Sequence, residues 1–348
     1  MPQSDWTSDT GEGASEAARR PARALRIRGE GPQGVGLDAN MFGHRDDSAR
    51  RLGVSFKPMK ILATVHVFYS EFWPELAACL HRVDVPCDVV VTLPEGSGVA
   101  ETVRSDFSDA RILFCENRGF DLWPFFASLD AAGIDGYTHV LKLHTKRDVH
   151  RDPPMVFNAF NYEGPRWRDA LISFLADGAT FAKCRALFDR DPSVAMIAGR
   201  DVILRRRDVP SPAVKRTFDD ALGYAAAEFG FRPTKPEFVA GTMFIAKADI
   251  FRPFLGRFKA ADFAESVKND TVVTLAHLLE RVLGFAACTD GRIADPDDSM
   301  RWRHLKSDIH AITAPFRRFL YQSKTTRNGA RIAKVCRIPV WHGKGARK

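Results

Sequence analysis

Two patterns of hydrophobic residues alternate along the chain from residue 58 onward. Continuous apolar runs that end in polar residues are typical of buried parallel strands, and the segments between them repeat apolar residues at helical spacing. This alternation predicts an α/β fold with a parallel, doubly wound sheet. The strands are expected at 60–69, 87–93, 111–117 and 137–146, and the helices at 72–83, 99–107 and 121–133.

The second half of the chain is less regular. One or two helices are expected at 167–191 and single helices at 216–231 and 269–284, with strands at 193–199 and 238–251, the last interrupted by a glycine. Asn269 or Asp270 would cap the helix at 269–284, which would end near Gly284. We expect one catalytic domain over residues 57–298.

The two ends of the chain differ from this domain. Residues 1–56 are rich in Gly, Ser, Asp and Arg without sustained periodicity, which predicts a disordered leader, and Met59 is a second candidate for the start of translation. Residues 299–348 hold thirteen Lys or Arg and one acid, Asp308, so this tail carries +12 and the rest of the chain −4. Such a tail attracts anions, either phospholipid head groups or nucleic acid, or is simply solvated.

No apolar run is long enough for a membrane span, and the N-terminus lacks the apolar core of a signal peptide. The six cysteines are scattered with no CxxC, so neither a disulfide framework nor a zinc site is expected. We therefore expect a cytoplasmic protein, with peripheral contact to the inner face of the plasma membrane through 299–348.

Ligands of doubly wound sheets bind beyond the carboxyl ends of the strands. His66 and Tyr69 follow the first strand, and the segment 116–121, ENRGFD, follows the third. In this turn the polar side chains can hold a ribose, a base or a phosphate. Alternatively, Asp121 caps the next helix and Arg118 pairs with Glu116.

Lys142, His144 and Lys146 alternate at the end of the fourth strand, so they share one face of an extended segment. Three cations on one side suit a diphosphate and could neutralise a leaving group without a metal. The alternative is an exposed strand end with solvated lysines. However, the segment continues directly from a buried strand, where a cation costs free energy unless it is paired.

Two later motifs carry weaker signals. Gly241 interrupts an apolar strand beside the hydroxyl of Thr242, which indicates either a close approach of the backbone to a ligand or an ordinary bulge. Asp270 stands at the expected start of a helix that presents His277, and it is either a general base or a simple cap.

Together and in this order, the motifs resemble the rhamnan synthesis protein F family over residues 58–298. The matching segments are HVFY at 66–69, NRGFD at 117–121, KLHTK at 142–146, AGTMF at 240–244 and DTVVTLAHLLER at 270–281. The resemblance implies a Rossmann-like, GT-A-type glycosyltransferase of bacterial surface polysaccharide assembly, with a mixed, mostly parallel sheet and helices on both faces.

GT-A enzymes place an Asn-containing turn after the third strand and a metal-binding DxD motif at the end of the next. Here His144, Thr145 and Lys146 occupy the DxD position, so a Mg or Mn ion is not assured. The resemblance places Asp270 where inverting members have their base, with Glu265 as a substitute.

The leading hypothesis is thus an inverting transferase that moves a sugar, rhamnose by analogy with the family, from a nucleotide-sugar donor to a glycan or lipid-linked acceptor. The alternatives are a non-catalytic subunit that binds nucleotide-sugar or carbohydrate, and nucleic-acid binding by the tail, which no recognised module supports. The expected donor-binding residues are His66, Tyr69, Asn117, Arg118, Gly119, Asp121, Lys142, His144 and Lys146; Gly241, Thr242 and His277 would face the acceptor, and Asp270 would be catalytic.

Overall fold

A computed structural model describes residues 58–148, 156–157, 160–161, 164–209, 211–265, 273–325, 331–335 and 338–343. The expected leader 1–56 and the expected base Asp270 lie outside the described residues.

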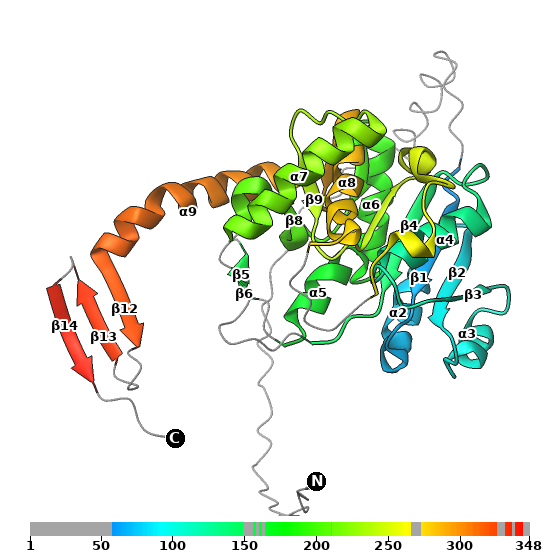
Figure 1. Ribbon diagram of the computed structural model, residues 1–348, viewed down its shortest axis with the longest axis horizontal. Helices are drawn as coiled ribbons and strands as arrows, with labels where there is room; N and C mark the ends of the chain where they lie inside the picture. Colours follow the sequence, from blue (N-terminus) through cyan, green and yellow to red (C-terminus); the bar gives the residue numbers. More distant parts are fainter. Residues whose placement is uncertain are drawn as a thin grey trace, which may run out of the picture. The chain divides into compact units, whose positions relative to one another are not determined.

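The fold is built on a seven-stranded sheet with the order β11-β7-β10-β4-β1-β2-β3 (Figure 1). Neighbouring strands are parallel except at β10, which runs antiparallel to both β4 and β7. This confirms the α/β class with a mixed, mostly parallel sheet. Its strands are β1 (Ile61–His66), β2 (Cys87–Pro94), β3 (Arg111–Cys115), β4 (His139–His144), β7 (Val194–Ile197), β10 (Phe244–Lys247) and β11 (Arg292–Ala294).

Helices pack against this sheet, with α4 on β1 and β2 and with α6 and α8 on β7. No described helix combines the length and the apolar composition needed to cross a bilayer. The α-helices are α2 (Trp73–Leu80), α3 (Ala100–Asp106), α4 (Leu122–Ala132), α5 (Arg166–Ile172), α6 (Gly178–Arg190), α7 (Pro212–Phe229), α8 (Leu275–Thr289) and α9 (Met300–Leu320).

Three small sheets accompany the large one. The tail region contains α9 and a three-stranded antiparallel sheet. The additional strands are β5 (Val156–Phe157) with β6 (Phe160–Asn161), β8 (Ile203–Arg205) with β9 (Glu237–Val239), and β12 (Tyr321–Thr325) with β13 (Arg331–Val335) and β14 (Ile338–Gly343).

The expected strand at 238–251 forms two strands in different sheets. β9 pairs with β8, and a turn at residues 240–243 carries the chain into β10 of the large sheet. Gly241 and Thr242 both have positive φ, 78° and 50°, so the break that the glycine predicted is a sharp turn that moves the chain from one sheet to another.

The expected helix at 269–284 was misplaced at both ends. α8 begins at Leu275 with Thr274 as its N-cap, because the His277 side chain accepts a hydrogen bond from the Thr274 amide in a capping box. It continues through Gly284, where a side chain would meet the backbone of β9, and ends at Thr289. The glycine therefore permits close packing rather than ending the helix.

Replacing Gly284 by Ala tests this packing. An added Cβ would lie 2.4 Å from the Glu237 carbonyl oxygen and 2.5 Å from Phe238 Cα. We expect a loss of about 1–3 kcal/mol in the free energy of unfolding, measured by urea denaturation, because backbone must move. The matched control is Gly223→Ala in α7, where nothing lies within 4 Å and the better helix propensity should add up to about 1 kcal/mol. Equal effects of the two substitutions would disprove the packing role.

Candidate functional site

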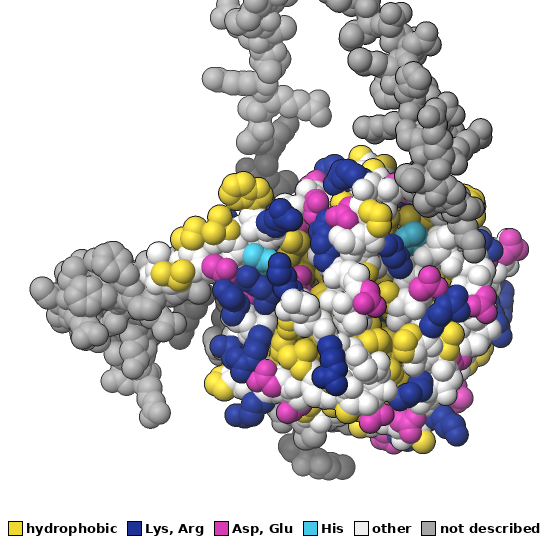
Figure 2. Space-filling view, turned by 90° about the horizontal axis from the view of Figure 1, so that it is seen from above, with side chains coloured by type: hydrophobic (Ala, Val, Ile, Leu, Met, Phe, Trp, Pro, Cys, Tyr) yellow, Lys and Arg dark blue, Asp and Glu magenta, His cyan; other side chains and the backbone are white. Residues whose placement is uncertain are grey.

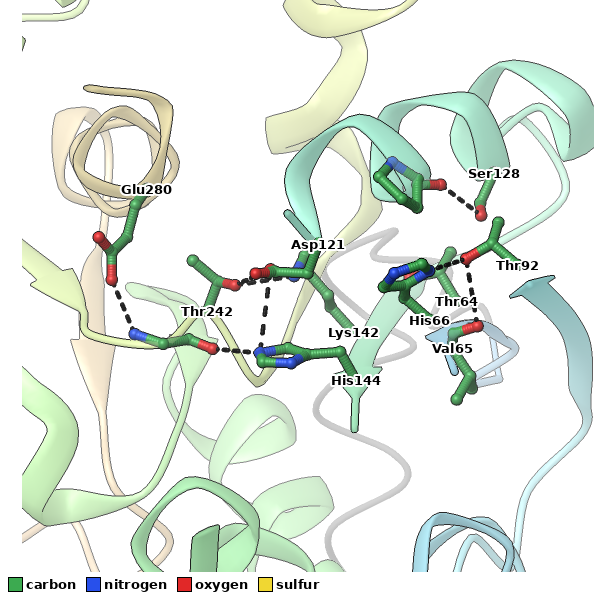
Figure 3. A network of polar contacts seen from close by, with 12 residues as sticks. Thr64, Val65, His66, Thr92, Asp121, Ser128, Lys142, His144, Thr242 and Glu280 are labelled. Carbon is green, nitrogen blue, oxygen red and sulfur yellow. Dashed lines mark hydrogen bonds and ion pairs between the residues drawn. The ribbon is translucent and has the colours of Figure 1, made fainter. Parts of the chain in front are cut away.

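A cluster of polar side chains lies at the carboxyl ends of β1 and β4 (Figure 3). We define the Asp121 cluster as Asp121, Lys142, His144 and Thr242. Lys142 Nζ contacts Asp121 Oδ2 and lies 2.8 Å from Thr242 Oγ1, and the Thr242 hydroxyl donates to the same carboxylate oxygen. His144 Nε2 lies 3.9 Å from that oxygen. Three residues from two separate segments thus converge on the carboxylate of Asp121.

The position of each cluster residue follows from the local sequence. Lys142 and His144 alternate on β4 and reach the same carboxylate, as their spacing predicts. Asp121 occupies the N-cap position of α4, but its side chain makes no capping bond and reaches Lys142 instead. The Lys142 side chain is only 2% exposed, and a buried ammonium requires such a partner.

The cluster contains one positive and one negative charge. Burial would raise the pKa of Asp121, but the Lys142 ammonium and the hydrogen bonds from Lys142 and the Thr242 hydroxyl hold it well below its ordinary value. Burial lowers the pKa of Lys142, and the carboxylate opposes that shift. Burial also lowers the pKa of His144, so we assign a neutral imidazole. Its Nε2 lies 2.7 Å from the Gly241 carbonyl oxygen and its Nδ1 lies 3.1 Å from the Thr145 carbonyl oxygen. Both oxygens can only accept, and the shorter contact assigns the proton to Nε2.

These charges differ from the three cations that the sequence suggested for binding a diphosphate. The sequence suggested three cations on one face, but Lys142 is neutralised by Asp121 and His144 is neutral at physiological pH. Lys146 is thus the one of the three that retains an unpaired positive charge within the described part of the chain. The cluster by itself therefore offers hydrogen bonds more than net positive charge.

The turn at 240–243 holds one side of the cluster. The Gly241 amide donates to Glu280 Oε1 at 2.8 Å, and its carbonyl accepts from His144 (Figure 3). Thr242 adopts φ of 50°, which is strained for a β-branched residue. The hydrogen bonds on both sides of the turn stabilise this conformation and direct the hydroxyl toward Asp121.

His66 lies beside the cluster at the end of β1. Its Nδ1 lies 3.0 Å from Thr92 Oγ1. Part of the ring remains accessible to solvent, but desolvation by its surroundings lowers the pKa of His66 to about 3, so it is neutral. A small crevice between β1, β2, β4 and α4 is lined by Thr64, Val65, His66, Thr92, Asp121, Phe125, Ser128, Lys142 and Leu143.

Thr145 joins the ends of β1 and β4. Its hydroxyl oxygen accepts hydrogen bonds from the amides of Phe68 and Tyr69, each at 3.0 Å. The Arg147 guanidinium lies over the Tyr69 ring, 4.2 Å from its centroid. The loop that carries Tyr69 is therefore held against the segment that carries Lys146.

The turn after β3 faces another segment of the chain. Arg118 Nε lies 2.9 Å from Glu116 Oε2, as the alternative interpretation of this turn expected, and the guanidinium also reaches Glu265 at 3.4 Å. Gly119 has φ of 61°, and an added Cβ would lie 2.4 Å from a ring carbon of Phe263. The glycine thus permits this close contact.

Three other expected site residues have different environments. Asn117 is exposed in the turn after β3. His277 caps α8 through Nδ1, and its ring contacts Phe120 with centroids 5.7 Å apart. Glu265, the substitute for Asp270, is 76% exposed. Of the two base candidates, the structure thus describes only Glu265, an accessible carboxylate paired with Arg118.

Two residues with clear roles in this arrangement were not among the expected site residues. Thr145 stands inside the KLHTK motif, and its place between His144 and Lys146 was a usable signal. Glu280 lies one helical turn after His277, but no pattern in the sequence indicates that it accepts from Gly241. Among the described residues, no three His, Cys, Asp or Glu side chains gather closely enough to hold a metal ion.

The fold and this cluster define an α/β protein with a polar site at the carboxyl edge of its parallel strands, where open α/β sheets bind ligands. A family model described as "Rhamnan synthesis protein F" matches residues 38–292. The chain belongs to this family.

Two relatives from Xanthomonas campestris pv. campestris, strains B100 and ATCC 33913, are both described as "Uncharacterized protein WxcX". Each is 27% identical to this chain over 231 residues, which cover 65% of this chain and 31% of the relative. The chain thus spans under a third of the length of these relatives.

Among solved structures, the chain is similar to 4-diphosphocytidyl-2C-methyl-D-erythritol synthase. The identity is 13% and the TM-score is 0.29, over 60% of this chain and 83% of that one. A likeness this low supports no statement about function.

Substitution of Lys142 by Met tests the buried ion pair. It leaves the Asp121 carboxylate buried without its cation, so the free energy of unfolding should fall by about 3–5 kcal/mol in urea denaturation. The double variant Asp121→Asn with Lys142→Met removes both charges and should lose clearly less. An equal loss in the single and double variants would contradict a charge-based role.

The same pair predicts an acid dependence of stability. Because the pKa of Asp121 is held below its ordinary value of 3.8, the unfolded chain binds more protons than the folded one at acid pH. This stabilisation is complete above that value and is lost as the pH falls below it. Urea denaturation across this range should show a smaller acid loss in the double variant than in the wild type, and matching pH profiles would refute the assignment.

Proposed function

We propose that this protein is a glycosyltransferase of polysaccharide biosynthesis, which moves a sugar from a nucleotide-sugar donor to a glycan or lipid-linked acceptor at the cytoplasmic side of the membrane. The observation that carries the proposal is the Asp121 cluster at the carboxyl ends of β1 and β4 in a chain of the rhamnan synthesis protein F family. Rhamnan is a polysaccharide of rhamnose, which supports a rhamnosyl donor as the first to test.

In this proposal the cluster acts mainly as a rigid frame. It fixes the end of β4 and the 240–243 turn, so that Lys146 stands at the edge of the sheet. There the lysine can approach the leaving diphosphate and stabilise the charge that develops on it. Neutral His66 can donate or accept a hydrogen bond at the same edge without adding charge.

Asp270 is proposed as the base that removes the proton from the acceptor hydroxyl, which would make the reaction inverting. Glu265 is the substitute, since its exposed carboxylate is held by Arg118. A Mg or Mn ion bound together with the donor diphosphate is compatible with either base, and the assays below include both ions.

A second candidate is a non-catalytic subunit that binds nucleotide-sugar. Two observations favour it. His144, Thr145 and Lys146 occupy the position of the DxD motif, and the charge of Lys142 is already neutralised by Asp121.

Lys146→Ala and Asp270→Asn test the transferase. Donor turnover is measured with dTDP-rhamnose and a panel of other nucleotide-sugars, with and without Mg or Mn. Each substitution should lower turnover at least about a hundredfold, the usual scale for one charge-stabilising group or one general base. Donor binding should weaken in Lys146→Ala and persist in Asp270→Asn.

The control is Lys60→Ala, which removes a lysine next to the start of β1, at the opposite edge of the sheet. Its surface pair with Asp88 contributes little to stability, so turnover should match the wild type. Unchanged turnover in both site variants would reject the site. Saturable donor binding without turnover in the wild type would favour the binding subunit.

A further inference from the structure

The helix α9 presents an apolar stripe to solvent. Trp302, Leu305, Ile309 and Ile312 are 76%, 49%, 53% and 77% exposed. They recur at three- and four-residue spacing and therefore lie on one side of the helix. We call these four residues the Trp302 stripe. Figure 2 shows hydrophobic and basic side chains close together along this helix.

The other side of α9 binds the body of the protein through polar contacts. His304 Nε2 lies 2.9 Å from Glu237 Oε1 of β9, and the Ser307 hydroxyl donates to Asp208 Oδ1 at 2.9 Å. These contacts fix the rotation of the helix about its own axis. The Trp302 stripe consequently faces away from the body.

Positive charge surrounds the stripe. Arg301 and Lys306 are exposed next to it. Asp308, the single acid of residues 299–348, forms ion pairs with Arg205 at 2.9 Å and with Arg207 at 2.8 Å. These two arginines therefore neutralise the charge of Asp308. The basic side chains next to the stripe then make this surface positive.

We propose that the Trp302 stripe binds an anionic phospholipid surface, with α9 lying in the plane of the membrane. An apolar face with a tryptophan, flanked by basic residues, is the pattern of interfacial helices. Anionic head groups complement Arg301 and Lys306, while the four apolar side chains enter the acyl boundary. This inference goes beyond the proposed function, because it holds whether or not the site transfers sugar.

The stripe fits a lipid surface better than a second copy of the chain. From Trp302 to Ile312 it spans about 15 Å of helix, and four side chains cover far less than the roughly 800 Å² per partner of a stable interface. Pairing two copies would also bring their basic residues together, which is repulsive.

Vesicle flotation of the full chain tests the proposal. The vesicles contain phosphatidylcholine alone, or phosphatidylcholine and phosphatidylglycerol in equal parts. The wild type should float with the mixed vesicles and bind the neutral ones weakly. The variant Trp302→Gln with Ile312→Gln should lose at least about tenfold in partitioning, since two large apolar side chains no longer leave water.

Two control variants separate apolar burial from general surface effects. Phe114→Gln alters a side chain that is 53% exposed on β3 and should float like the wild type. Arg301→Gln with Lys306→Gln should weaken binding to the mixed vesicles by about fivefold per charge and leave the neutral ones unaffected. Thermal melts should coincide for all variants, because every substituted side chain is exposed.

Three outcomes would overturn the proposal. The first is a wild type that does not float with the mixed vesicles. The second is flotation that survives loss of the stripe. The third is a concentration-dependent dimer in sedimentation that Trp302→Gln with Ile312→Gln dissociates, which would assign the stripe to a second copy of the chain.

Discussion

The arrangement of the candidate site depends on one buried ion pair, between the Lys142 ammonium and the Asp121 carboxylate. A lysine that is 2% exposed within the central sheet would be strongly destabilising without this partner. The pair also sets the positions of its neighbours, since Thr242 donates to the same carboxylate and His144 lies beside it. The geometry of the strand ends is thus fixed by the need to neutralise one charge.

The sequence predicted the regular parts of the fold well. Continuous apolar runs identified β1 to β4. The run is clearest in β1, which is buried along nearly its whole length, whereas β3 at the end of the sheet exposes Arg111 and Phe114. The sequence predicted the bounds of α8 wrongly, because tertiary contacts determine them. The start of α8 depends on the side chain of His277, and Gly284 serves close packing against β9, neither of which periodicity records.

The sequence predicted which side of β4 the polar residues share, but not the charge of the cluster that they form. Alternation on β4 correctly placed Lys142 and His144 on one side. The contact with Asp121 was not predicted, because Asp121 follows β3, which β2 and β1 separate from β4. A sequence does not show how deeply a side chain is buried. Lys142 was therefore expected to bind a ligand, whereas in the structure its charge is neutralised by Asp121. The remaining basic group at that edge, Lys146, carries the main electrostatic role in the proposed transferase.

The wide separation of the cluster residues along the chain has a consequence for assembly. Asp121 and Thr242 are 121 positions apart, and Lys142 and Thr242 are 100 apart. Contacts between such distant residues require closing long loops of chain, and they depend on the strands that bring the segments together. No isolated fragment around β4 or α8 would therefore reproduce this arrangement of side chains, and a ligand held by residues at this edge of the sheet would stabilise the domain as a whole rather than a single loop.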